Sequence, residues 1–404
     1  RVADIGLIVN SAKDGITVGL EKAWKSLKES GLPFAVYISK IDEENGSFEA
    51  VFNALREKYG PNVCPLMAPV KNAGGRVDGI VDLIRRKAFK IEKGNRVEVP
   101  IPDSMAGELE TYYKDINECV AESSEEFMEK YFSGEEFTTE ELIAGLKAGV
   151  QDGSIIPVFC GTAVGNMGTL ALLDAIIDLF PSPLGRKEKT AEGEEFAVDP
   201  NGSACAFVFK TIVDPFVGKI NIMKVISGKL SLGMEVFNTR TEKTEKLGNL
   251  FFMRGKSQAE TDTAVAGDIV AAAKLQFTQT GDTLCDKANY IKYPPVSFPE
   301  PTLFMAVEPK AKGDEEKISS GLAKLMEEDP SFVMTRNNET HQTLIGGQGE
   351  IQIGIITAKL KDKFGVNVDL VDQKIPYRET IKGKSDVQGK HKKQSGGAGQ
   401  YGDV

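Results

Sequence analysis

Lys40 and Asp42 lie two residues apart at the end of an apolar run that begins at Pro33. The run is rich in aromatic and branched residues, a composition typical of a strand buried on both faces of a parallel sheet. Ligands of open α/β sheets bind outside the carboxyl ends of the strands, where these two charges would lie. A carboxylate at that place can select a ligand that offers N–H groups, because a buried carboxylate left without donors is penalised. Two solvated charges at a strand end are the alternative interpretation.

A second apolar run, residues 155–159, leads into a short loop of small residues, Cys160 to Ala163. The two strand ends together resemble the guanine site of P-loop GTPases. In that family an [Asn]-Lys-x-Asp sequence follows one strand: its aspartate accepts hydrogen bonds from N1–H and the exocyclic amine, and its lysine stem covers the base. A Ser/Thr-Ala loop after a later strand directs a backbone N–H to the guanine carbonyl. The resemblance implies a guanine site made of Ser39, Lys40, Asp42, Thr162 and Ala163.

Ser39 departs from this pattern, because it stands where the family has asparagine. That asparagine ties the base-binding loop to the phosphate-binding loop. A serine hydroxyl would replace it only in part.

Strands and amphipathic helices alternate around these two segments. Residues 5–9 and 62–70 are further strand candidates. Helical patterns follow the Asp14–Gly15 turn and Ser47, which can cap a helix, and another helix is expected from about residue 170 to residue 180. This alternation predicts a parallel sheet built from βαβ units, with a strand–helix connection between neighbours.

The texture changes after residue 203. Short apolar runs with glycine turns over residues 204–286 predict a β-barrel. Residues 303–371 read as strand, helix, two strands joined by a hairpin, helix and strand, which is the split βαβ arrangement. The predicted domains are residues 1–185, with an insertion at about 90–153, residues 203–290, residues 300–373 and a final segment, 374–404.

The charge of the chain is concentrated in the insertion. The whole chain carries −10, but fourteen acidic and three basic residues between 103 and 152 give −11 there, so the remainder carries +1. An acidic whole-chain balance therefore does not exclude nucleic acid as a partner of the other domains. The acidic segment is either a solvated face or a docking site.

Composition indicates a cytoplasmic, multidomain globular protein. Apolar residues make up 41% and charged residues 27%, and no apolar run reaches membrane-spanning length. The five cysteines are scattered without CxxC spacing, so we expect packing residues rather than disulfides or zinc ligands. With two histidines, a histidine-rich metal site is not expected.

Over essentially all 404 residues the chain resembles bacterial elongation factor G, the translocation GTPase, or a close paralog. The motifs that carry the resemblance are residues 1–4, 157–163 and 181–183 in the first domain, 214–219 and 281–285 in the barrel, 346–350 in the βαβ domain, and the glycine-rich run 394–402. The resemblance implies a partial P-loop GTPase domain with a helical insertion, a translation-factor β-barrel, a ferredoxin-like domain and the start of a fourth domain. It also implies GTP, with Mg²⁺ in the intact parent, as the cofactor.

The phosphate-binding sequence Gly-x-x-x-x-Gly-Lys-[Ser/Thr] does not occur in the chain. The near matches at 255–257 and 383–385 lack the first glycine and the strand–loop–helix context, so both are coincidental, and Asp386 to Gly389 is taken as surface. We therefore expect an internal piece of a longer protein with no catalytic residue and no metal ligand, unable to hydrolyse GTP itself. Loss of the preceding strands would leave an unpaired edge, which predicts disorder or altered pairing near residues 1–15.

The resemblance implies the ribosome as partner, through rRNA and ribosomal proteins, with the acidic insertion as a docking site for the stalk protein. The fourth domain of the parent would act on tRNA and mRNA, and the protein would be a monomer without membrane contact. Candidate RNA contacts in this chain are Lys390, His391, Lys392 and Lys393, for which a solvated tail is the alternative. Two other functions stay open: a ribosome-protection or recycling paralog, and a ribosome-binding regulator that has lost hydrolysis.

Overall fold

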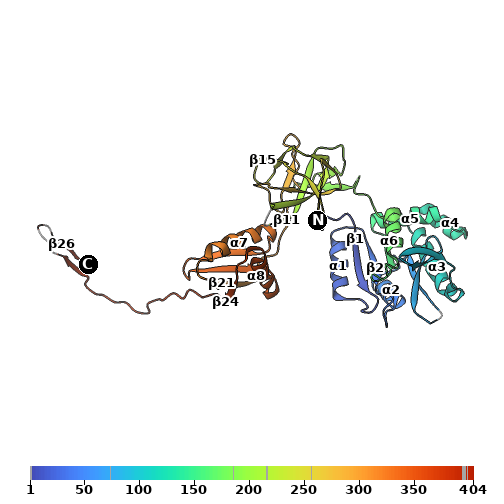
Figure 1. Ribbon diagram of the computed structural model, residues 1–404, viewed down its shortest axis with the longest axis horizontal. Coiled ribbons are helices and arrows are strands. Elements are labelled where there is room, and N and C mark those ends of the chain that lie inside the picture. Colours follow the sequence, from blue (N-terminus) through green and yellow to red (C-terminus); the bar gives the residue numbers. More distant parts are fainter. Residues whose placement is uncertain are drawn as a thin grey trace.

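The computed structural model describes residues 2–72, 74–184, 186–214, 217–255, 257–393, 397 and 399–404. Figure 1 shows a parallel α/β domain, an antiparallel β domain and a βαβ domain, followed by an extended segment that ends in a strand pair. This arrangement confirms the predicted multidomain α/β and β architecture. Some residues of the motifs and segments named above lie outside the described residues: Arg1, Gly185, Pro215, Phe216, Lys256, Gln394, Ser395, Gly396 and Ala398.

A four-stranded parallel sheet in the order β1-β2-β8-β3 forms the centre of the first domain. Its strands are β1 (Gly6–Ser11), β2 (Phe34–Ser39), β3 (Val63–Pro65) and β8 (Ile156–Cys160), and its helices are α1 (Val18–Glu29), α2 (Phe48–Tyr59) and α6 (Thr169–Leu179). The apolar run after Pro33 is the interior strand β2, in which Ala35, Val36 and Ile38 are fully buried. The predicted cap is confirmed, since the Ser47 hydroxyl accepts from the N–H of Ala50.

The prediction of disorder or altered pairing near residues 1–15 is wrong for the described part of that segment. β1 pairs with β2 in unbroken parallel register, from Gly6 opposite Phe34 to Ser11 opposite Ser39. Packing of α1 supports this pairing, because Gly6 lies so close to Leu27 that an added Cβ would meet its side chain at 2.7 Å. The edge position shows only in exposure: Val9 is 62% exposed, whereas Ile8 is 5% exposed.

The prediction that residues 62–70 form one strand is wrong, because they form two strands in different sheets. The first part is β3 in the parallel sheet, Leu66 donates its N–H to the carbonyl of Val158, and β4 (Met67–Lys71) then begins a separate antiparallel sheet. The other strands of that sheet are β5 (Val77–Asp82), β6 (Lys87–Glu92) and β7 (Asn95–Val99). None of these three strands is predicted above from the sequence. The predicted helices of the acidic segment are present as α3 (Ala106–Ala121), α4 (Glu125–Ser133) and α5 (Thr139–Asp152), preceded by the 3-10 turn η1 (Asp103–Met105).

The second domain is an antiparallel β structure. Its main sheet has the order β15-β14-β20-β11-β12-β19-β16-β17, beside the pair β13-β18. The strands are β11 (Cys205–Asp214), β12 (Gly218–Ser227), β13 (Lys229–Ser231), β14 (Glu235–Asn238), β15 (Lys243–Lys246), β16 (Phe251–Arg254), β17 (Ser257–Glu260), β18 (Thr263–Val265), β19 (Ile269–Ala273) and β20 (Thr283–Cys285). The segment before it contains a short hairpin of β9 (Lys187–Lys189) and β10 (Glu195–Ala197).

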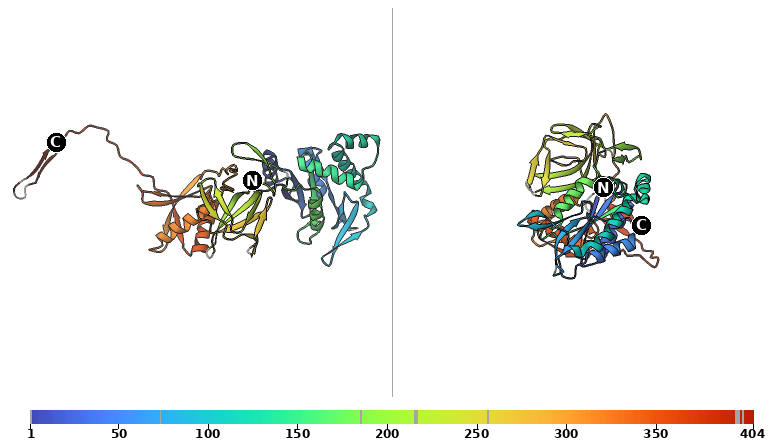
Figure 2. Two further views of the ribbon diagram at one scale, coloured as in Figure 1. Left: turned by 90° about the horizontal axis from the view of Figure 1, so that it is seen from above. Right: turned by 90° about the vertical axis from the view of Figure 1, so that its right-hand side faces the viewer.

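The third domain has the predicted order of elements: β21 (Leu303–Pro309), α7 (Glu315–Glu328), β22 (Val333–Asn337), β23 (Gln342–Gly347), α8 (Glu350–Phe364) and β24 (Val368–Val371). Its sheet runs β22-β23-β21-β24, and both helices bury apolar residues against it. The strand pair β25 (Lys390–Lys393) and β26 (Gln400–Asp403) lies far from the domains, as Figure 1 and the left view of Figure 2 show.

The five cysteines are free and buried, which confirms their expected role in packing. Among the described helices, none combines the length and the apolar composition that crossing a membrane requires.

Candidate functional site

The ends of β2 and β8 lie side by side. The two strands are parallel neighbours with Ile38 opposite Cys160, and the N–H of Gly161 donates to the carbonyl of Ile38 at 3.1 Å. The segments that follow therefore leave the sheet at the same edge. The structure in this way brings the loop of Ser39, Lys40 and Asp42 next to the loop of Thr162 and Ala163.

The loop after β2 has an unusual backbone at Lys40. Its φ is +60°, in the left-handed region that few residues other than glycine adopt. The bend places the side chain of Ile41 in the core, 2% exposed, while Lys40 and Asp42 are exposed on either side of it. The burial of Ile41 helps to offset the backbone strain at Lys40. Strain of this kind is often found at ligand sites.

The carboxylate of Asp42 is available to a ligand. Within the described part of the chain it has no hydrogen-bond or ion-pair partner, whereas the Nζ of Lys40 lies 3.7 Å from a carboxylate oxygen of Glu43. An exposed carboxylate on a fixed loop can accept two hydrogen bonds from adjacent N–H groups on the edge of a planar ligand.

The two residues of the second loop have different environments. Thr162 is 3% exposed, and its backbone N–H already donates to the carbonyl of Met167 at 2.9 Å. Ala163 is exposed and supplies the next N–H along the loop. This geometry suits Thr162 to shaping the loop and Ala163 to contacting a ligand.

Tyr37 and Gly161 hold the second loop against β2. A Cβ on Gly161 would lie 2.1 Å from the hydroxyl oxygen of Tyr37 and 2.3 Å from the carbonyl oxygen of Met167, so only glycine fits at this position. Burial, together with the neighbouring Cys160, raises the pKa of Tyr37 to about 12. The tyrosine is therefore neutral at physiological pH and packs as an uncharged wall beneath the loop.

Ser39 is bound to the neighbouring strand. Its hydroxyl donates to the carbonyl of Asn10 at 3.1 Å, while the Asn10 side chain, 4% exposed as a residue, donates to the carbonyl of Gly15 at 2.6 Å. Thr17 also donates its hydroxyl to the Oδ1 of Asn10 at 3.2 Å. Asn10 is not among the site residues predicted from the sequence. The signal that could have identified it is its position directly after the apolar run 5–9 and before Asp14–Gly15.

This donor and acceptor set fits a purine base that offers N–H groups and a carbonyl, as guanine does. It consists of a carboxylate, a lysine stem and a backbone N–H at one sheet edge. Within the described residues no group of three or more His, Cys, Asp or Glu side chains could hold a metal ion.

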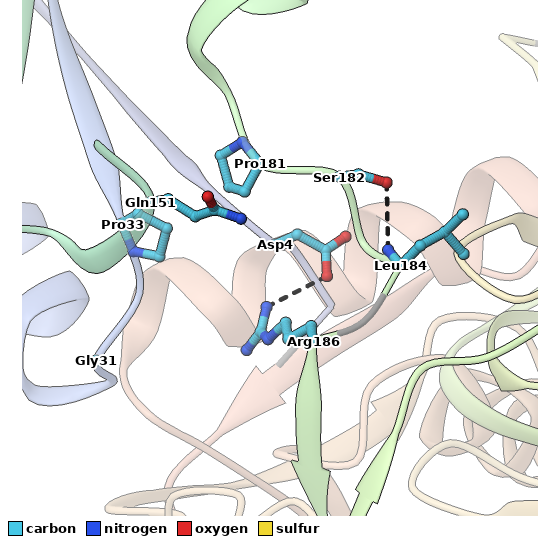
Figure 3. A pocket seen from close by; sticks show the side chains of 8 residues that line it. All are labelled: Asp4, Gly31, Pro33, Gln151, Pro181, Ser182, Leu184 and Arg186. Atoms are coloured by element: carbon cyan, nitrogen blue, oxygen red, sulfur yellow. Dashed lines mark hydrogen bonds and ion pairs between the residues drawn. The ribbon is translucent and has the colours of Figure 1, made fainter. Parts of the chain in front are cut away.

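A separate pocket of about 540 Å³ is lined by residues of the first domain and by Arg186 of the segment that follows it (Figure 3). Asp4 and Arg186 point toward one another in it, and the Oδ1 of Asp4 accepts from Arg186 at 3.2 Å and from the Nζ of Lys224 at 2.7 Å. Lys224, 4% exposed, lies on β12 and also donates to the carbonyl of Val2 at 2.7 Å. Asp4 thus forms ion pairs with Arg186 and with Lys224 of the β domain. We call these contacts the joint between the two domains.

The remaining candidates lie on the surface. Lys390, His391, Lys392 and Lys393 form β25 and are exposed. In the acidic segment, α4 buries none of its residues and leaves Phe132 80% exposed. His341 is exposed in the β22–β23 turn, and the glycines at 346–349 end β23 and precede α8.

Comparison with known families agrees with this geometry. Residues 1–182 match the elongation factor Tu GTP binding domain, residues 203–287 match elongation factor G domain 2, and residues 298–372 match elongation factor G domain III. Domain by domain, the chain is thus similar to translation elongation factors that bind GTP. A crystal structure of a protein from Thermus thermophilus is similar, with 33% identity and a TM-score of 0.85. The match covers 100% of this chain and 59% of that one, so the chain spans about three fifths of this relative.

Proposed function

We propose that the intact parent of this chain is a ribosome-associated GTPase of the elongation factor G type that promotes GTP-dependent translocation of tRNA and mRNA. The observation that carries the proposal is the succession of a GTP-binding domain, a domain 2 and a domain III, matched to the family in that order. GTP would hold a ribosome-binding conformation, and hydrolysis would release it.

Guanine recognition is assigned to the shared edge of β2 and β8. Asp42 would accept hydrogen bonds from the N1–H and the exocyclic amine, the stem of Lys40 would cover the base, and the N–H of Ala163 would donate to the base carbonyl. Thr162 shapes the loop through Met167, and Ser39 fixes the first loop to Asn10. Adenine has no hydrogen at N1 and no amine at the matching position, so it would leave Asp42 without donors.

The phosphate chemistry of the parent is assigned to residues that this chain does not contain. Its 404 residues include no Gly-x-x-x-x-Gly-Lys-[Ser/Thr], and no described cluster could hold Mg²⁺. Mg²⁺, when bound with GTP in the parent, would neutralise charge that develops on the phosphates. We propose accordingly that the domains lie at about 1–185, 203–290, 300–373 and 374–404, and that these 404 residues by themselves do not hydrolyse GTP.

The exposed surfaces suggest where ribosomal partners bind. The cationic strand Lys390–Lys393 would contact RNA phosphates, with the salt dependence that such contacts have. The acidic segment, with Phe132 and Met128 exposed on α4, suits a ribosomal stalk protein of opposite charge. The parent would act as a cytoplasmic monomer.

Poly-phenylalanine synthesis by ribosomes supplied with the full-length protein tests this proposal. A translocase restores synthesis to ribosomes depleted of their own factor, in proportion to GTP hydrolysed. Ribosome-stimulated hydrolysis without synthesis would instead indicate the protection or recycling paralog. Ribosome binding without any hydrolysis would indicate a regulator, for which the replacement at Ser39 is the one hint in the sequence.

A further inference from the structure

The end of β11 meets the βαβ domain through its backbone. β20 pairs with β11 only over Cys205–Phe207, so farther along, at Val213, the described residues place no strand beside the edge that faces away from β12. Helix α7 lies beside this part of β11 instead (Figure 1). An open strand edge presents N–H and C=O groups that need partners.

Two charged side chains of the βαβ domain supply those partners. The Oε1 of Glu328, at the end of α7, accepts from the N–H of Val213 at 2.8 Å. The Nζ of Lys363, at the end of α8, donates to the carbonyl of Val213 at 3.1 Å and also to the Oε1 of Glu328. Both backbone groups of one residue are thus bound by an ion pair from another domain.

Burial makes this contact stronger than an ordinary surface ion pair. The side chain of Glu328 is 9% exposed and that of Lys363 is 26% exposed, while Lys359 approaches the other carboxylate oxygen at 3.6 Å. A second pair, Lys219 with Glu327 at 3.6 Å, lies in the same interface, and its carboxylate is more exposed, at 46%. Hydrogen bonds to charged groups are about twice as strong as neutral ones, and they strengthen as water is excluded.

We propose that Glu328 and Lys363 are positioning residues that form a latch on the backbone of Val213, and that this latch fixes the βαβ domain to the β domain. The extended segment with Lys390–Lys393 follows β24 of the βαβ domain, so the latch also fixes the base from which that segment extends. This last consequence rests on the proposed contact with RNA, whereas the latch itself does not.

Hydrogen exchange at the Val213 amide and a distance between the two domains test the latch in the 404-residue chain. Spin labels would be placed by Lys229→Cys on β13 and Asn338→Cys in the β22–β23 turn, both exposed; the five native cysteines are buried. With Glu328→Ala we expect exchange at Val213 to accelerate about ten- to a hundredfold, as the loss of a hydrogen bond to a charged group predicts. The distribution of distances between the two labels, narrow in the chain that keeps Glu328, should become broad.

Three further variants separate a latch from a general loss of stability. Glu328→Gln keeps an acceptor for the amide, so it should restore slow exchange at Val213 but not the narrow distance. Lys363→Met should broaden the distance while Glu328 still protects the amide. Lys317→Met, which removes an exposed ion pair with Asp314 on the same helix, should change neither reading.

The latch is refuted if Glu328→Ala and Lys363→Met both leave the label distance narrow, or if Lys317→Met broadens it equally. Should Glu328→Ala unfold the βαβ domain, seen as loss of helical circular dichroism, Lys363→Met alone decides the distance test. If the variants behave as predicted but the protein fails to bind ribosomes, the proposed function is refuted and the proposal of the latch still holds.

Discussion

Replacing Lys224 by methionine should weaken the joint between the α/β domain and the β domain. The side chain of Lys224 is 5% exposed and donates to Asp4 and to the carbonyl of Val2, both at 2.7 Å. Methionine keeps the length and packing of the aliphatic stem but removes both hydrogen bonds. Breaking a buried ion pair from one side costs about 3–5 kcal/mol. Arg186 still contacts Asp4, and the Asp4 side chain is 21% exposed, so we expect about 2 kcal/mol here.

The single tryptophan makes this cost measurable. Trp24 lies in the core of the α/β domain, whereas Lys224 belongs to the β domain, so denaturant unfolding followed by Trp24 fluorescence reports an effect only if the joint couples the two. We expect Lys224→Met to lower the free energy of unfolding seen by Trp24, with Asp4→Asn giving a non-additive double mutant. Lys229→Met, at an exposed position of β13, is the matched control. If Lys224→Met changes the free energy of unfolding reported by Trp24 by less than about 0.5 kcal/mol, the contact does not couple the two domains and the prediction is wrong.

Three smaller predictions concern the loops at the candidate site. Gly161→Ala should destabilise the chain by about 1–3 kcal/mol because its Cβ meets Tyr37, and Gly165→Ala, whose nearest neighbour would be 3.9 Å away, should be near neutral in denaturant titrations. The pKa of Tyr37, about 12, exceeds the value near 10 of an unfolded tyrosine, so its contribution to stability is complete below pH 10 and lost as the pH rises toward 12. Tyr37→Phe should remove that part of the alkaline loss, and an unchanged pH profile would contradict the assignment. Ser39→Ala should cost about 1 kcal/mol through its bond to Asn10, while Ser39→Thr, which keeps a hydroxyl, should recover most of it.

Local patterns predicted those elements whose signal is complete within one segment. The run after Pro33 is apolar on both faces, and it is the interior strand β2. Ser47 precedes apolar residues at helical spacing, and it caps α2. Sequence could not show that residues 62–70 divide at Leu66, because the apolar run is continuous and the division depends on which sheet each half joins. Strands β6 and β7 were not predicted because they mix charged with apolar residues and contain no continuous apolar run.

The candidate site was predictable to the level of the sheet edge. Parallel pairing of β2 with β8 accounts for the neighbouring positions of the loops that carry Asp42 and Ala163, and both loops follow strand ends that the sequence predicts. The different roles of Thr162 and Ala163 depend on a bond to Met167 within a loop, which spacing does not reveal. Contacts such as Lys224 with Asp4, or Glu328 with Val213, join residues far apart in sequence from different domains. They follow from domain packing, which no single segment encodes.

Nucleotide competition on the full-length protein tests guanine recognition by Asp42 most directly. Two hydrogen bonds to an exposed carboxylate, at about 1.5 kcal/mol each, predict a preference for GTP over ATP of about 100-fold or more. Asp42→Asn should reduce GTP affinity by a similar factor and favour xanthosine triphosphate, because the amide N–H₂ can donate to the second carbonyl of xanthine. Equal binding of ATP and GTP by the parent, or an unchanged preference in Asp42→Asn, would contradict the account.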